Sequence, residues 1–169
     1  RTIQEVKPDV IVNAAAYTAV DKAESEPDLA MKINAEAPRV LAEEAEAIGA
    51  AIVHYSTDFV FDGSRDQPYN ELEKGSPLSQ YGKSKLAGDL AIINVCPRHL
   101  IFRTSWVFGA HGNNFLKTIL KLAAERTSLR VVADQVGVPT SADLIASTTA
   151  QVVAVMAIAP AEDSRWGVY

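Results

Sequence analysis

The sequence predicts an α/β fold in which helices cover a parallel β-sheet, and two observations support this. Short runs of β-branched and apolar residues, typical of buried strands, alternate along the chain with longer segments of helical periodicity. The 169 residues are 48% apolar and 22% charged, which is the composition of a folded protein with a hydrophobic core. No repeat, low-complexity segment or linker divides the chain, so we expect one domain.

The first half of the chain predicts two strands around a helical segment. The run DVIVN at 9–13 predicts the first strand, and AIVHYS at 51–56 predicts the second. Between them, residues 27–49 follow a helical pattern that Pro38 would disturb. We expect Asn34 to cap a fresh helix there, which leaves Pro38 in the first turn, where proline is tolerated.

The second half continues the alternation. The pattern predicts a helix over 79–95 with an inward stripe formed by Leu86, Leu90 and Ile93. The other expected elements are a strand at 99–105, a helix at 114–125, a strand at 129–133 and a helix at 142–157. Residues 165–169 predict the start of one more strand.

Charge and composition narrow the class of function. A net charge of −5 argues against a broad surface for nucleic acid or anionic membrane. No apolar run approaches the ~20 residues that span a bilayer, and we expect no secretory leader. The single cysteine, Cys96, cannot form an internal disulfide, which favours a reducing cytoplasm and a buried, inert thiol. The three histidines lack zinc-ligand spacing, so no metal site is expected.

Ligands of open parallel sheets bind beyond the carboxyl ends of the strands. The segments 14–18, 56–63 and 104–109 follow three predicted strands and are rich in hydroxyl, small and aromatic residues. They are therefore expected to meet at one crevice.

Tyr81 and Lys85 lie four positions apart on the predicted helix, so the lysine ammonium can approach the phenol. A nearby cation lowers the pKa of a tyrosine towards the range of efficient general acid catalysis. Thr57, at the end of the second strand, can donate a hydrogen bond to a substrate carbonyl. The alternatives are a solvated pair on the helix surface and a hydroxyl that closes a turn.

With these residues in place, the chain resembles the extended short-chain dehydrogenase/reductase superfamily, most closely its dTDP-4-dehydrorhamnose reductase family. The segments that carry the resemblance are PDVIVNAAAYTAVDKAESEP, HYSTDFVFDG, PLSQYGKSKLAGDLA, LIFRTSWVFGAHGNNF and DQVGVPTSA. The resemblance implies a Rossmann-like, doubly wound parallel sheet that binds NADPH or NADH. It also implies reduction of the 4-keto group of a dTDP-4-keto-6-deoxy sugar in dTDP-L-rhamnose biosynthesis.

The resemblance assigns roles to individual residues. Tyr81 would protonate the carbonyl oxygen, Lys85 would lower the pKa of Tyr81 and bind the nicotinamide ribose, and Thr57 would polarise the same oxygen. The implied cofactor contacts are Ala16, Tyr17, Thr18 and Tyr55, together with Tyr81 and Lys85. The implied substrate contacts are Thr57, Asp58, Val20 and Trp106, with Asn34 as a further candidate. For Trp106 the alternative is a core tryptophan after a strand.

One feature of the motifs separates related activities. Sugar-nucleotide dehydratases of this superfamily carry Asp-Glu after the threonine, whereas this chain has Asp58 followed by Phe59, which favours simple reduction. A catalytically idle dinucleotide-binding regulatory subunit, similar to that of methionine adenosyltransferase, is the alternative from another class. A homodimer formed through the helix at 79–95 is compatible with the reductase activity.

The chain departs from the family pattern in one respect. It contains no G-x-x-G-x-x-G segment, which in this family holds the cofactor pyrophosphate. We therefore expect residues 1–169 to be a partial NAD(P)-binding Rossmann domain, truncated at both ends. The choice between NADH and NADPH stays open, because the strand that precedes the selective side chain is missing.

Overall fold

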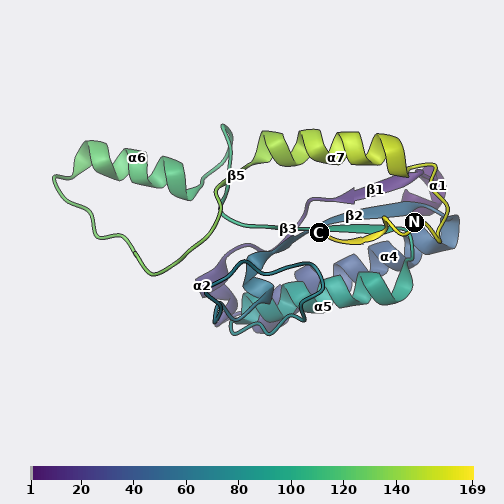
Figure 1. Ribbon diagram of the computed structural model, residues 1–169, viewed down its shortest axis with the longest axis horizontal. Helices are drawn as coiled ribbons and strands as arrows, with labels where there is room; N and C mark the ends of the chain where they lie inside the picture. The colour runs from purple at the N-terminus through teal and green to yellow at the C-terminus, as the bar shows by residue number, and fades with distance from the viewer. Residues whose placement is uncertain (1) are drawn as a thin grey trace. The chain divides into compact units, whose positions relative to one another are not determined.

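The computed structural model describes residues 2–169, which form two compact units (Figure 1). The first unit runs as far as Arg103 and resumes from Val155 to Tyr169, and the second spans Thr104–Ala154. Among the described residues, no helix is both long and apolar enough to cross a membrane.

A four-stranded sheet in the order β1-β2-β3-β6 forms the centre of the first unit. Its strands are β1 (Val10–Asn13), β2 (Ala51–Thr57), β3 (His99–Thr104) and β6 (Gly167–Val168). β1 pairs in parallel with β2, and β3 pairs in parallel with β6. The strands predicted at 9–13, 51–56 and 99–105 and the strand start at 165–169 are confirmed. Because β1 and β2 are parallel neighbours, the residues that follow them emerge at the same edge.

Two helices, α4 (Ala37–Ile48) and α5 (Gln80–Val95), lie side by side on one face of this sheet (Figure 1). The core between helices and sheet is made of small and branched residues, namely Ala42, Ala45, Ala50, Ile52, Ile92, Cys96 and Ile101. Burial of such side chains stabilises the fold by about 25 cal/mol for each Å² of apolar surface. The Cys96 thiol is fully buried, as predicted, and burial raises its pKa, which disfavours the reactive thiolate.

The remaining helical segments of this unit are short and lie before β1, between β1 and α4, or directly after β2. They are α1 (Thr2–Val6), α2 (Val20–Ala23), α3 (Pro27–Met31), the π-helical turn η1 (Lys32–Glu36) and the 3₁₀ turn η2 (Asp58–Val60). α3, η1 and α4 follow one another without a break, so the prediction that Asn34 caps a fresh helix is wrong.

Proline chemistry explains this difference. In an α-helix the carbonyl of Asn34 would accept from the N–H of residue 38, but Pro38 has none. The helix instead widens into a π turn at this point, and Pro38 stands in the first turn of α4, as predicted. Asn34 is buried in the π turn, and its side chain, which caps no helix, can hydrogen-bond to other segments.

The helix predicted at 79–95 is confirmed as α5, with Ser79 as its N-cap, but the predicted inward stripe is wrong. Leu90 is 49% exposed and Ile93 is 36% exposed. The buried face of α5 consists of Tyr81, Gly82, Ser84, Lys85, Gly88, Asp89 and Ile92. Two glycines allow backbone to approach this face: a Cβ on Gly88 would lie 2.1 Å from the carbonyl oxygen of Asn34, and one on Gly82 would lie 2.2 Å from that of Phe59.

The second unit contains a two-stranded parallel sheet and two helices. β4 (Val107–Phe108) pairs with β5 (Thr140–Ser141). The helices predicted at 114–125 and 142–157 are confirmed as α6 (Phe115–Glu125) and α7 (Ala142–Met156). The strand predicted at 129–133 is wrong: these residues form no regular structure. A β-branched run becomes a strand only when a neighbouring backbone pairs with it, and Val131 and Val132 instead line a pocket.

Candidate active site

The candidate site lies at the carboxyl edge of the first unit's sheet. Asn13 ends β1 and Thr57 ends β2. The loop 14–18 and the turn η2 leave the sheet at this edge, where the first turn of α5 contributes Tyr81. Of the three segments predicted to meet at one crevice, those after β1 and β2 leave the sheet at this edge within the unit.

Thr57 and Tyr81 meet at this edge, as the sequence predicted. Their side chains lie close enough for Thr57 to lower the pKa of the Tyr81 phenol. The Thr57 hydroxyl also donates to the Asp58 carboxylate at 3.1 Å and accepts from the backbone N–H of Phe59 at 3.2 Å. The Phe59 ring packs edge-on against Tyr81, with ring centroids 5.7 Å apart. The Thr57 hydroxyl is thus fixed in position, and Tyr81, whose ring contacts Phe59, is largely buried.

Lys85 lies one helical turn after Tyr81 on α5 and is only 2% exposed. Its Nζ donates to the backbone carbonyl of Tyr55 at 2.7 Å and lies 3.1 Å from Nε2 of His54. Burial lowers the pKa of Lys85 to about 8, while the neighbouring Asp89 acts in the opposite direction.

The pKa of Tyr81 shifts in the direction opposite to the prediction. Burial raises it, and the charges of Asp58 and Asp89 raise it further, while the hydrogen bond with Thr57 lowers it in part. Lys85 is not among these causes, and its Nζ donates instead to the Tyr55 carbonyl on β2. In this structure Tyr81 is therefore a protonated phenol, as a general acid must be before it acts.

The loop after β1 carries three of the predicted cofactor contacts, Ala16, Tyr17 and Thr18. The Asn34 side chain holds this loop: its Oδ1 accepts from the Tyr17 N–H at 2.8 Å, and its Nδ2 donates to the Tyr17 carbonyl at 3.0 Å. The same Nδ2 donates to Ser84 Oγ on α5 at 3.0 Å. Asn34 is thus a link between the loop and the catalytic helix.

Two other predicted residues lie close to this loop. Val20 and Tyr17 pack against a small buried cluster that includes Tyr81, so the structure brings these candidates together. Tyr55 contributes its carbonyl to Lys85, while its ring stacks on Phe102 with centroids 6.4 Å apart.

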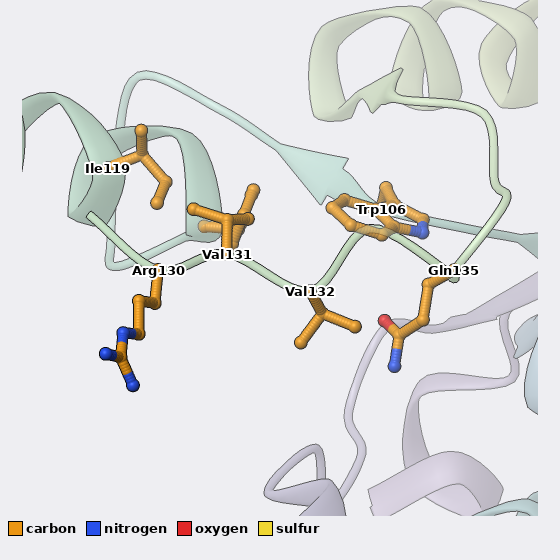
Figure 2. A pocket seen from close by; sticks show the side chains of 7 residues that line it. Trp106, Ile119, Arg130, Val131, Val132 and Gln135 are labelled. Atoms are coloured by element: carbon orange, nitrogen blue, oxygen red, sulfur yellow. The ribbon is translucent and has the colours of Figure 1, made fainter. Parts of the chain in front are cut away.

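Trp106 belongs to the second unit and lines a pocket of about 220 Å³ (Figure 2). Its backbone has a positive φ of 47°, and its indole packs edge-on against the Phe115 ring, with ring centroids 5.1 Å apart. Gly137 leaves room for the ring, since a Cβ there would lie 2.3 Å from the indole nitrogen. Val131, Val132 and Ile119 give the pocket an apolar lining beside the exposed indole. A substrate contact for Trp106 stays a prediction.

Comparison with known proteins identifies the family. A family model described as the RmlD substrate binding domain matches residues 1–169. The chain belongs to this family. Its relatives include dTDP-4-dehydrorhamnose reductases from Salmonella typhimurium, 56% identical over 154 residues, and from Escherichia coli K12, 53% identical. Each alignment covers 91% of this chain and 52% of the relative, so the chain spans about half the length of the curated relatives it matches.

Solved structures agree with the RmlD assignment. A dTDP-4-dehydrorhamnose reductase from Clostridium acetobutylicum superposes with a TM-score of 0.90 at 42% identity, covering 99% of this chain and 57% of the other. The Bacillus anthracis reductase, solved in complex with NADP, gives a TM-score of 0.87 at 40% identity and covers the same shares. The predicted Rossmann-like fold and the predicted resemblance are both confirmed.

Two buried residues of this RmlD-family chain were missed by the sequence reasoning. Asp89, which is fully buried, accepts from Ser56 Oγ at 2.6 Å and lies 3.8 Å from Nε of Arg103. Burial raises its pKa to about 6. His54, on β2, contacts Lys85. The signal for Asp89 was present in the sequence, since it lies four residues after Lys85, as Lys85 lies four after Tyr81.

The residues present fit one end of a nicotinamide dinucleotide. Ala14 and Ala15 are small and exposed at the carboxyl edge of β1, and the backbone of Tyr17 is held by Asn34. Small residues, tyrosine hydroxyls and a lysine suit a flat ring and a ribose. Among residues 2–169, no cluster of three or more His, Cys, Asp or Glu side chains could hold a metal ion, and metal independence stays a prediction.

Proposed function

We propose that the protein containing this chain is an NAD(P)H-dependent reductase of a dTDP-4-keto-6-deoxy sugar, a dTDP-4-dehydrorhamnose reductase. The observation that carries the proposal is the meeting of Thr57 and Tyr81 at the carboxyl edge of β2, with Lys85 buried beneath them. The names of the relatives at 56% and 53% identity support the same activity.

Each residue has a defined part in this reaction. Bound NAD(P)H supplies the hydride. Tyr81 gives its phenolic proton to the carbonyl oxygen as negative charge develops there, and burial keeps that proton in place beforehand. The Thr57 hydroxyl, held by the Phe59 N–H, turns its one proton from Asp58 to the same oxygen when substrate binds and polarises the carbonyl. Asp58, half-buried beside Thr57, contacts a sugar hydroxyl.

The local geometry favours reduction over elimination. Elimination needs a second acid–base group beside the substrate. The position after Asp58 is Phe59, whose aromatic ring packs against Tyr81 and cannot transfer a proton. The alternative of an idle regulatory subunit is not favoured, because the reported relatives are named as reductases and Thr57, Tyr81 and Lys85 are all retained.

The wider assignments belong to the same proposal. Residues 1–169 form part of an NAD(P)-binding Rossmann domain, and the dTDP sugar is the small-molecule partner. A cytoplasmic location accords with the single free cysteine. A homodimer through the exposed apolar face of α5 stays a prediction, which the molecular mass in solution would test.

The test is Tyr81→Phe, which removes one hydroxyl and keeps the ring. We expect a fall in kcat of about 10²- to 10⁴-fold, with NAD(P)H affinity nearly unchanged. Consumption of NAD(P)H with a dTDP-4-keto-6-deoxy sugar measures turnover, and fluorescence titration measures cofactor binding. Tyr69→Phe is the matched control, since Tyr69 bonds Asp62 and stacks on Phe61 in a surface loop.

Two outcomes would contradict the proposal. Turnover that survives Tyr81→Phe would remove Tyr81 as the acid. Wild-type protein that binds NAD(P)H without reducing any such sugar would support the regulatory alternative instead.

A further inference from the structure

His54 lies in the interior of the site, 1% exposed, and no role follows for it from the proposed reaction. Its ring lies between two side chains: Nδ1 is 3.0 Å from Nδ2 of Asn13, and Nε2 is 3.1 Å from Nζ of Lys85. A neutral imidazole carries one N–H and one bare nitrogen. The two contacts therefore determine which nitrogen holds the proton.

Asn13 settles the choice. One end of its side-chain amide lies 3.2 Å from the backbone N–H of Ala15, which can only donate, so this end is the oxygen. The other end is the amide NH₂, and it donates to Nδ1 of His54. The His54 proton is consequently on Nε2, and the Nε2–H points at Lys85.

Lys85 must then accept from His54. Its Nζ already donates to the Tyr55 carbonyl at 2.7 Å. An ammonium group has no lone pair and would turn one N–H towards the Nε2–H at 3.1 Å, which is repulsive. An uncharged amine has a lone pair for this contact.

We propose that His54 is a positioning residue for Lys85: its Nε2–H tautomer, imposed by Asn13, holds the lysine against β2 and lowers its affinity for a proton. The effect on turnover rests on the proposed function, in which Lys85 has the implied role of binding the nicotinamide ribose. The effect on Lys85 itself does not depend on that function.

The surrounding charges are consistent with this assignment. Burial, with Lys85 beside it, lowers the pKa of His54 to about 3, so the ring stays neutral at physiological pH. Asp89 on α5, 3.9 Å from Nε2 of His54, is the acidic group that favours the ammonium form, and Arg103 on β3 offsets part of its charge. Tyr81 and Asp58 interact with each other one helical turn further towards the edge.

The first experiment reads the tautomer directly in the purified wild-type protein. Long-range ¹H–¹⁵N spectra of ¹⁵N-histidine-labelled protein distinguish a proton on Nε2 from one on Nδ1. Only three histidines lie in this chain, and His54→Gln identifies the signal. We expect the proton on Nε2 from pH 6 to 9. A proton on Nδ1 overturns the proposal whatever the outcome of the reductase assay.

The second experiment reverses the tautomer. In Asn13→Asp a carboxylate replaces the amide and accepts from Nδ1–H, so that Nε2 becomes the acceptor for the Lys85 ammonium. The pKa of Lys85, followed by NMR of ¹³Cε-labelled lysine, should rise by about one unit or more. The pH above which turnover falls should rise by the same amount as the pKa of Lys85.

A double-mutant cycle separates the tautomer from the added charge. In the His54→Gln background no tautomer exists, so adding Asn13→Asp should raise the pKa of Lys85 by clearly less. An equal rise in both backgrounds would mean that the carboxylate acts only through space, and the proposal would be wrong. If Asn13→Asp does not fold, the wild-type tautomer decides alone.

Discussion

Gly88→Ala tests whether the catalytic helix depends on direct backbone contact with η1. The added Cβ would lie 2.1 Å from the carbonyl oxygen of Asn34 and 3.2 Å from its carbonyl carbon. Both neighbours are backbone atoms, so no side chain can rotate away. α5 and η1 must therefore separate by roughly 1 Å before the two atoms reach van der Waals contact.

The cost follows from what this separation disrupts. Overpacking of this kind costs about 1–3 kcal/mol, and the better helix propensity of alanine returns about 1 kcal/mol. Separation also breaks the Asn34–Ser84 hydrogen bond, 3.0 Å long and buried, at about 1 kcal/mol. We expect a net loss of about 1–3 kcal/mol in the free energy of unfolding.

Urea denaturation of wild type and Gly88→Ala measures this loss. Asn94→Ala, at an exposed position of the same helix, is the control, because it improves helix propensity and adds no atom. The control should be equal to or slightly more stable than wild type. If Gly88→Ala were as stable as the control, α5 would not be in contact with Asn34, and the link from the Tyr17 loop to the catalytic helix would be lost.

Two further predictions concern the face of α5 that is buried. Leu90→Ala should lower the free energy of unfolding by less than about 1 kcal/mol because Leu90 is half exposed, whereas Ile92→Ala should lower it by about 2–5 kcal/mol. Equal losses in urea denaturation would mean that Leu90 is buried, as the stripe predicted from the sequence requires. Burial raises the pKa of Asp89 to about 6, so the folded protein binds this proton more tightly than the unfolded chain. Wild type should therefore lose stability relative to Asp89→Asn as pH rises from about 4 to 6, by on the order of 3 kcal/mol, and a pH-independent difference between the two proteins would contradict this.

Local patterns in the sequence predicted most of the fold. Runs such as DVIVN and AIVHYS are short and β-branched, and each became a strand of the central sheet. The helices predicted to start at 79 and 114 do so, with Ser79 and Asn114 as their N-caps. Each of these side chains accepts from the backbone N–H three residues later. The run at 129–133 is also short and contains two valines but forms no strand, because pairing depends on a partner that composition does not reveal.

The candidate site was predictable only in part. Motifs brought Thr57, Asp58 and Tyr81 to attention, and the structure places these residues together. The partners of Lys85 were not predictable, because they come from a backbone carbonyl and a histidine on β2, about 30 residues earlier in the chain. Asn34 was expected to be a cap because its position before Pro38 resembles a helix start. Its actual role follows from the π turn that this proline induces.

The orientation of α5 shows why a helical stripe is a weak guide at such a site. Turning Leu90 and Ile93 inward would bury more apolar surface and no charge. The helix instead buries Lys85 and Asp89, and burying a charge costs several kcal/mol before its partners compensate. Glycines at 82 and 88 permit the close backbone contacts that hold this orientation. Stability alone does not select such a face, whereas a requirement to align Tyr81, Lys85 and Asp89 in one row from the sheet edge into the interior does.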